Sequence, residues 1–368
     1  MATIKNGKGT ICLATFDEKA ELRRHEFGRP APGPNDVSIE IKYCGMCHSD
    51  LHASNGDWGL GFYPISAGHE IAGVVQSIGS NVKDSEFKVG DRVGVGCFVD
   101  SCGKCEQCSN GEVNYCRNHQ QTYGTEYKKG LGHDECAGNH TNGGYSSQIT
   151  VKKDFVFKVP ENVDLSYVGP LLCAGITMFS PLNRHVLQKD NGKPKKVGIV
   201  GFGGLGQMGT KLAKAMGCEV TILSRSTKKK DEAAKLGANL IAHTDEDEMK
   251  KAAMSFDVII DTIAVPHEIQ NMISSLKVGG TWVCIGAIPQ PCSISPMGLI
   301  FSNYHLEGSL VGGLPETQQM LDFCSKHNTL PDIKVINAKD ASAQFKALAD
   351  GTADVKRAVI DMSTLGDL

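Results

Sequence analysis

The sequence lacks a strong excess of either charge, since 38 lysines and arginines stand against 41 aspartates and glutamates. This balance gives no electrostatic reason to expect nucleic acid or an anionic membrane as a partner. No apolar run approaches the ~20 residues that span a bilayer. The first ten residues, MATIKNGKGT, also lack the apolar segment of a secretory signal. We therefore expect a cytoplasmic protein without a nucleic-acid or membrane partner.

The chain has 368 residues, more than a single hydrophobic core usually supports, so we expect two domains. Up to about residue 160 the pattern is β-rich, with short alternating runs such as residues 37–42 broken by glycine and proline. From about residue 195 to 310, short apolar runs alternate with amphipathic helical segments. This alternation predicts an α/β fold with a parallel sheet between helices. The predicted domains are residues 1–163 and 164–310, with residues 311–368 returning to the first.

Fourteen cysteines are unusual for a cytoplasmic chain, and disulfide frameworks belong to small secreted domains. Four of the cysteines are clustered in a loop that contains glycine, serine and asparagine. That spacing favours closed, tetrahedral coordination of a structural zinc ion, in a lobe over residues 97–118. An iron–sulfur cluster is the competing interpretation, and acidic residues in the loop disfavour nucleic-acid binding. The four cysteines are Cys102, Cys105, Cys108 and Cys116.

A second set of potential metal ligands is dispersed along the chain. Cys47, His69 and Cys173 together supply two thiolates and an imidazole, the ligand set of a catalytic zinc that keeps one position open. Taken singly, His69 could be an ordinary core histidine and Cys173 a packing residue. The interpretation therefore depends on their lying together.

A glycine-rich turn follows the apolar run that ends at Val200 and precedes a helical pattern. In that context the motif G-x-G-x-x-G predicts a dinucleotide site, because glycines let the backbone approach a pyrophosphate at a helix N-terminus. The residues of the motif are Gly201, Phe202, Gly203, Gly204, Leu205 and Gly206.

The end of the next strand indicates which nicotinamide cofactor is used. NAD sites place an acidic residue there for the ribose 2′-hydroxyl, whereas this chain reads LSRSTKK over residues 223–229. Hydroxyls and cationic groups can bind a 2′-phosphate by charge-assisted hydrogen bonds, so we predict NADP(H). The alternative is that the lysines only begin a solvated helix. The predicted phosphate ligands are Ser224, Arg225, Ser226 and Lys229.

Seven stretches carry a resemblance along essentially the whole chain: GMCHSDLH, DWG, YPISAGHEIAG, CGKCEQC, LLCAGIT, GFGGLG and SRSTKK. In these the chain resembles the zinc-dependent medium-chain alcohol dehydrogenases, specifically the cinnamyl alcohol dehydrogenase-like branch and its broad-specificity aldehyde reductases. The resemblance implies a GroES-like β-rich catalytic domain, a Rossmann domain, two zinc ions per chain and a homodimer.

The resemblance also implies roles for individual residues. Cys47, His69 and Cys173 are similar to the catalytic zinc ligands, and Glu70 to an acid that approaches the metal during ligand exchange. Three further residues of one segment resemble supporting groups, namely Asp50, which would orient His69, and the proton-relay residues Ser49 and His52. Trp58 resembles a substrate-pocket residue, and Leu60 stands at a pocket position where the branch more commonly has a small or polar residue. Positions similar to cofactor contacts are His48, Ser49, Thr177, Thr262, Gly286, Ser309, Leu310 and Val311.

These observations predict an enzyme that transfers hydride between NADP(H) and small to medium aldehydes or primary alcohols, mainly as an aldehyde reductase. One alternative is an NAD-linked polyol or secondary-alcohol dehydrogenase, which would need an acidic residue after Leu223. Another is a non-catalytic, zinc-stabilised binding protein, which should have lost Cys47, Ser49, His52, His69 or Cys173.

Overall fold

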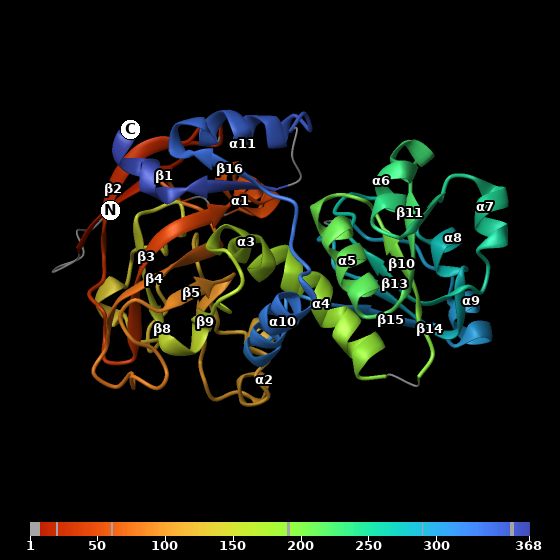
Figure 1. Cartoon of the computed structure of the whole chain (residues 1–368), viewed down its shortest axis with the longest axis horizontal. Helices are drawn as coiled ribbons and strands as arrows, with labels where there is room; N and C mark the ends of the chain where they lie inside the picture. Colours follow the sequence, from red (N-terminus) through yellow and green to blue (C-terminus); the bar gives the residue numbers. More distant parts are fainter. Residues whose placement is uncertain (1–7, 20, 60–61, 190–191, 289, 354–356) are drawn as a thin grey trace. The chain divides into compact units, whose positions relative to one another are not determined.

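The computed structural model describes residues 8–19, 21–59, 62–189, 192–288, 290–353 and 357–368. The chain forms two compact units. The first comprises Met1–Cys173, Gly313–Ser325 and Pro331–Leu368, and the second comprises Ala174–Gly312 and Lys326–Leu330. In Figure 1 the blue segments β16 (Lys334–Asn337) and α11 (Ala341–Ala349) accordingly lie beside the red strands β1 (Lys8–Ala14) and β2 (Arg23–Arg29). The predicted domain ranges stay predictions.

The first unit is built on a mainly antiparallel sheet with the strand order β16-β17-β3-β4-β5-β9, and β8 also pairs with β3. Most residues of β3 and β4 are buried, which places the core around these central strands. The strands are β3 (Asp36–Gly45), β4 (Glu70–Ile78), β5 (Arg92–Val95), β8 (Gln148–Lys152), β9 (Phe157–Lys158), β16 (Lys334–Asn337) and β17 (Ala358–Asp361). Two separate pairs are β1 (Lys8–Ala14) with β2 (Arg23–Arg29), and β6 (Phe98–Asp100) with β7 (Gln120–Gln121).

Short helices connect these strands. Gly169 in α3 lies against β4 so closely that a Cβ there would come within 2.2 Å of the Glu70 carbonyl oxygen. This close approach packs α3 tightly against β4 within the first unit. The helices are α1 (His48–Ser54), α2 (Glu106–Ser109), α3 (Leu165–Pro170), α10 (Leu314–His327) and α11 (Ala341–Ala349).

The second unit contains a six-stranded parallel sheet with the order β12-β11-β10-β13-β14-β15. This order, 3-2-1-4-5-6 in chain sequence, is that of a dinucleotide-binding fold and confirms the predicted α/β class. The strands are β10 (Lys196–Val200), β11 (Glu219–Ser224), β12 (Asn239–Ala242), β13 (Phe256–Asp261), β14 (Leu276–Cys284) and β15 (His305–Gly308). The helices are α4 (Ile176–Leu182), α5 (Gly204–Ala215), α6 (Lys230–Lys235), α7 (Glu246–Lys251), α8 (Gln270–Ile273) and α9 (Pro296–Ser302).

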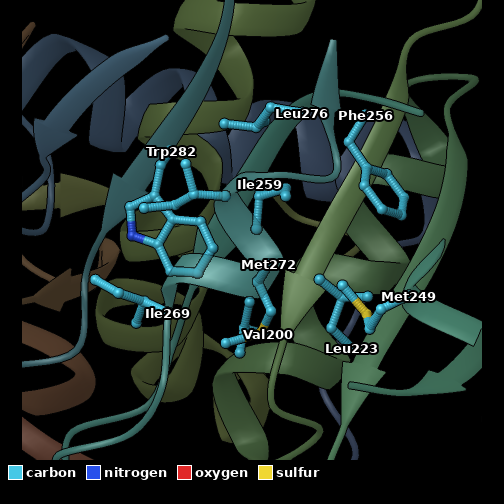
Figure 2. Close-up of a cluster of buried hydrophobic side chains, with 10 residues drawn as sticks. Val200, Leu223, Met249, Phe256, Ile259, Ile269, Met272, Leu276 and Trp282 are labelled. Atoms are coloured by element: carbon cyan, nitrogen blue, oxygen red, sulfur yellow. The ribbon is translucent and has the colours of Figure 1, made fainter. Parts of the chain in front are cut away.

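The core of the second unit is apolar on both the strand and the helix side. Met249 of α7 and Met272 of α8 pack with strand residues that include Val200, Leu223 and Trp282, all of them buried (Figure 2). The start of α7 is capped, because the Asp245 carboxylate accepts hydrogen bonds from two backbone N–H groups there.

One helical run, Leu165–Leu187, is long and apolar enough by length and composition to cross a membrane. It is an exception to the expectation that no apolar stretch has that length. Its most apolar window is 83% buried inside the protein, as in the core helix of a folded domain. The run includes two π-helical segments, Leu171–Gly175 and Asn183–Leu187, which change the helical phase.

Candidate active site and metal centres

The structure brings the dispersed metal-ligand candidates together in the first unit. Potential ligand atoms of Cys47, His69, Glu70 and Cys173 all lie within 4.8 Å of one another. Cys47 is the residue before α1, His69 directly precedes β4, and Cys173 lies in the π-helical segment. The Cys47 and Cys173 sulfurs are 3.9 Å apart, and His69 Nε2 is 3.2 Å from the Cys173 sulfur.

This group fits a zinc ion by its chemistry. A disulfide requires sulfurs about 2.05 Å apart, so the 3.9 Å separation leaves two free thiols. Around a tetrahedral zinc with Zn–S bonds of about 2.3 Å, two sulfurs would lie about 3.8 Å apart. A hydrogen bond from the Cys173 thiol also lowers the pKa of Cys47 well below its ordinary value, so the site favours a thiolate.

Asp50 connects two of these ligand candidates. Its side chain is fully buried, and one carboxylate oxygen accepts from His69 Nδ1 at 2.9 Å and from the Gly68 backbone N–H at 3.0 Å. The other accepts from the Cys47 backbone N–H at 2.9 Å and from the Tyr145 hydroxyl at 2.8 Å. A carboxylate in this place fixes the orientation of the His69 ring and leaves Nε2 free for a metal.

Glu70 is fully buried beside the same group and pairs with a residue that sequence reasoning missed. Arg357 Nη1 lies 2.7 Å from Glu70 Oε1, and Oε2 finds no hydrogen-bond partner among the described residues. Burial raises the pKa of Glu70 to about 7, although Arg357 opposes this rise. Gly45 gives the carboxylate its space, because a Cβ there would come within 2.0 Å of Oε2. A buried carboxylate oxygen without a partner fits a group that reaches a metal.

The predicted relay residues lie three positions apart on α1, so they share a face of that helix. Ser49 is half-buried, with its hydroxyl 3.7 Å from the Cys47 sulfur. His52 Nδ1 lies 2.8 Å from an Asp57 carboxylate oxygen, and the His52 ring centroid is 5.6 Å from that of Trp58. Trp58 is 49% exposed, as a substrate-contacting ring could be. Leu60 lies outside the described residues.

The four clustered cysteines also come together, in the loop between β6 and β7. Their sulfurs lie within 4.8 Å of one another, with separations of 3.5, 3.6 and 3.9 Å between three pairs. Hydrogen bonds from the backbone N–H groups of Lys104 and Cys105 lower the pKa of Cys102 to about 6. The spacing matches four thiolates around one zinc and excludes disulfides.

The glycine turn of the second unit has the geometry expected of a nucleotide loop. Gly201 has φ +89° at the end of β10, and Gly203 precedes α5, with open space where its Cβ would be. A Cβ on Gly206 would come within 2.2 Å of the Gly201 carbonyl oxygen, so that position requires glycine. Phe202 between them is buried, and Leu205 is half-buried in the first turn of α5.

The basic segment lies next to this turn. Ser224 ends β11 and is half-buried, while Arg225, Ser226 and Lys229 are exposed. The Lys229 ammonium donates to the Phe202 carbonyl oxygen at 3.4 Å, which brings a positive charge to the glycine turn.

The other predicted cofactor contacts are distributed over both units. Thr262 follows β13 and donates to the Val200 carbonyl oxygen at 2.7 Å. A Cβ on Gly286 would come within 2.0 Å of the Ile263 carbonyl oxygen. Ser309, Leu310 and Val311 follow β15, and Val311 has φ +51°. His48 is exposed at the start of α1 in the first unit, and Thr177 is half-buried in α4 in the second. Their contacts with a cofactor stay predictions.

Sequence reasoning missed three further residues near the first metal group: Tyr123, Tyr145 and Cys97. Tyr123, 6% exposed, has its ring centroid 5.8 Å from that of His69, and burial raises the pKa of its hydroxyl well above the ordinary value, with the Asp50 charge adding to the rise. The side chains of Cys47 and Cys97 raise the pKa of Cys173 well above its ordinary value. No local pattern marks these positions, since each is distant in sequence from the group that it contacts.

Comparisons with known proteins agree with this geometry. Residues 33–161 match the family of the alcohol dehydrogenase GroES-like domain, and residues 204–326 match the zinc-binding dehydrogenase family. The aldehyde reductase YahK of Escherichia coli is 43% identical, over 96% of this chain and 99% of the relative.

Two solved structures are similar over nearly the whole chain. One is a cinnamyl alcohol dehydrogenase from Sorghum bicolor, with 38% identity, a TM-score of 0.88 and coverage of 97% of this chain and 98% of the other. The other is CAD from Helicobacter pylori complexed with NADP(H), with 38% identity, a TM-score of 0.85 and coverage of 97% and 99%. The chain therefore belongs to the zinc-dependent medium-chain alcohol dehydrogenases, in the cinnamyl alcohol dehydrogenase-like branch, and is an alcohol and aldehyde oxidoreductase.

Proposed function

We propose that this oxidoreductase uses NADP(H) and works mainly as a reductase of small to medium aldehydes. The observation that carries the cofactor assignment is the end of β11, where Ser224 stands in place of an acid and cationic side chains follow. An acid there would repel a 2′-phosphate, whereas a hydroxyl, a guanidinium and an ammonium bind it. The NADP(H) complex of the Helicobacter pylori relative supports the same assignment.

In this proposal the chain holds two zinc ions. Cys47, His69 and Cys173 hold the catalytic one, while the four-cysteine group holds a structural one that has no open position for substrate. When bound, the catalytic ion would supply Lewis acidity for an alcohol or aldehyde oxygen, and the nicotinamide would be the hydride donor or acceptor.

The chain's own groups position the reactants and move the proton. Asp50 holds His69 in place, and the Glu70 carboxylate lies ready to replace a departing ligand. Ser49 Oγ exchanges a proton with the substrate oxygen, and His52, oriented by Asp57, exchanges that proton with solvent. Trp58 offers an apolar surface to the aldehyde's carbon chain.

Steady-state kinetics with NADPH and NADH on a panel of aldehydes and alcohols test this proposal. We expect a higher kcat/KM for NADPH and for aldehyde reduction. Equal or higher values with NADH, or a preference for polyols or secondary alcohols, would contradict it and favour the NAD-linked alternative.

Replacing Ser224 by Asp should shift the preference toward NADH. A charge-assisted hydrogen bond contributes about 1.5–3 kcal/mol, so its loss should lower the NADPH-to-NADH ratio of kcat/KM by about tenfold to a hundredfold. Ala234→Asp is the matched control, since it adds one negative charge on the exposed surface of α6 and should leave the ratio unchanged. An unchanged ratio in S224D would place the phosphate site elsewhere.

We also propose that the enzyme is a homodimer formed through the edge of the second unit's sheet. β15 is the outer strand of that sheet, and neighbouring apolar side chains are exposed: Ile300 is 75% and Phe301 78% exposed on α9, and Leu306 39% on β15. Exposed apolar groups beside a strand edge favour association with another copy. A cytoplasmic location is part of the same proposal, which fourteen free thiols support.

Leu306→Lys should weaken this association, because it places a charge on the proposed interface. Light scattering should then show the mass of one chain where the parent shows that of two. Val89→Lys, at an apolar residue that is 65% exposed in the first unit, is the control and should leave the dimer intact. A dimeric L306K protein would rule out this edge.

A further inference from the structure

The fully buried Asp50 carboxylate is joined to four donors within 3.0 Å, two on each oxygen. Three of these donors belong to the metal-ligand segments themselves: the Cys47 N–H, the Gly68 N–H and His69 Nδ1. The fourth, the Tyr145 hydroxyl, comes from the turn before β8. Asp50 therefore hydrogen-bonds to the segments of two proposed zinc ligands, and Tyr145 is the one of the four donors that lies in neither of those segments.

Tyr145 is itself held firmly in place. Its side chain is fully buried, and its ring contacts that of Phe345 on α11 edge to face, with centroids 6.2 Å apart. Its backbone N–H donates to the Ala67 carbonyl oxygen at 3.0 Å, and its carbonyl oxygen accepts from the Leu13 N–H at 2.8 Å. The hydroxyl therefore has little freedom to find another acceptor, and its direction is fixed toward Asp50.

We propose that Tyr145 is a positioning residue of the catalytic metal site, which through Asp50 sets the placement of His69 and Cys47 and so the affinity of the site for zinc. The proposal rests on the zinc assignment made above. A carboxylate has about four lone-pair sites, and here the four donors occupy them. Without the tyrosine hydroxyl, one of these sites loses its donor inside the protein, and the carboxylate can rotate away from His69 Nδ1 and the Cys47 N–H.

The test is Tyr145→Phe, which removes the hydroxyl and keeps the ring against Phe345. Zinc affinity is measured by competition with a chelator, and Co²⁺ substitution gives an absorption spectrum that reports on ligand geometry. Removing a residue that hydrogen-bonds to a metal ligand typically lowers metal affinity about 10- to 100-fold. We therefore expect Y145F to bind zinc at the catalytic site about tenfold more weakly than the parent. The zinc of the four-cysteine group should be retained, and the Co²⁺ absorption bands should shift.

Tyr63→Phe is the matched control. The Tyr63 hydroxyl also donates a 2.8 Å hydrogen bond, but to the Ser54 carbonyl oxygen in α1 rather than to a metal-site group. We expect Y63F to keep the parent's zinc affinity and Co²⁺ spectrum.

The outcomes separate this inference from the function on which it rests. A parent chain that binds no zinc through Cys47, His69 and Cys173 would contradict the proposed function. A parent that binds zinc there, together with a Y145F protein of unchanged affinity and spectrum, would overturn the role of Tyr145 alone. Failure of Y145F to fold at saturating zinc would also overturn it, since the hydroxyl would then support the fold itself.

Discussion

Cys47→Ala is expected to abolish turnover while leaving the chain folded. The variant removes one of the three ligands proposed for the catalytic zinc, and the remaining His69 and Cys173 cannot hold the metal in a defined position. Loss of Lewis-acid assistance costs several kcal/mol of transition-state stabilisation, which corresponds to at least about 10³-fold in kcat/KM. Aldehyde reduction with NADPH, measured beside the zinc content of the same sample, checks this result.

Cys44→Ala is the matched control for that experiment. Cys44 lies three residues away and is fully buried, but it is not part of the group of ligand atoms within 4.8 Å. We expect C44A to keep its zinc and its turnover, with a modest loss of stability from the removed sulfur. Full activity in C47A would disprove the metal assignment.

The second large effect is expected from Cys105→Ala, and it should be a loss of stability. The short loop between β6 and β7 has little apolar core of its own, and none of the residues of α2 is buried. We therefore expect the proposed structural zinc to supply most of the stability of this loop, and its loss to lower the free energy of unfolding by several kcal/mol. Thermal unfolding with and without added zinc measures the effect.

Cys136→Ala serves as the control for Cys105→Ala. Cys136 is fully buried in the first unit and belongs to neither metal group, so its replacement should cost only the small packing term of a buried sulfur. Below its unfolding temperature C105A should still reduce aldehydes, because the catalytic ligands are untouched. Unchanged thermal stability together with full zinc content in C105A would contradict the structural role.

The sequence was most informative where a functional site is formed by residues that lie close together in the chain. The four-cysteine loop and the glycine turn each lie within fifteen consecutive residues, so their spacing alone predicted a closed metal site and a nucleotide turn. The dispersed ligands Cys47, His69 and Cys173 formed a complete zinc-ligand set and each lies in a motif of a known family, but the sequence alone could not show that they lie together. The structure then placed them within 4.8 Å of one another.

Contacts between distant segments could not be predicted in this way. Arg357 pairs with Glu70 across 287 positions, and Tyr145 donates to Asp50 across 95. Neither residue belongs to a motif. The residues around a buried arginine or tyrosine beside a strand do not distinguish it in sequence from a residue with no partner in the site. The helical run Leu165–Leu187 was also missed, because Pro170 and Pro181 inside it interrupt the helical pattern of the sequence.

The central claim is that catalysis depends on a zinc ion held by Cys47, His69 and Cys173, separately from a second, structural zinc. The most direct test removes zinc stepwise with a chelator while zinc content, NADPH-dependent aldehyde reduction and folding are measured together. We predict two zinc ions per chain, loss of turnover when the first is removed from the still-folded protein, and recovery when one equivalent is returned. Full turnover in a folded chain that retains only the four-cysteine zinc would contradict the account.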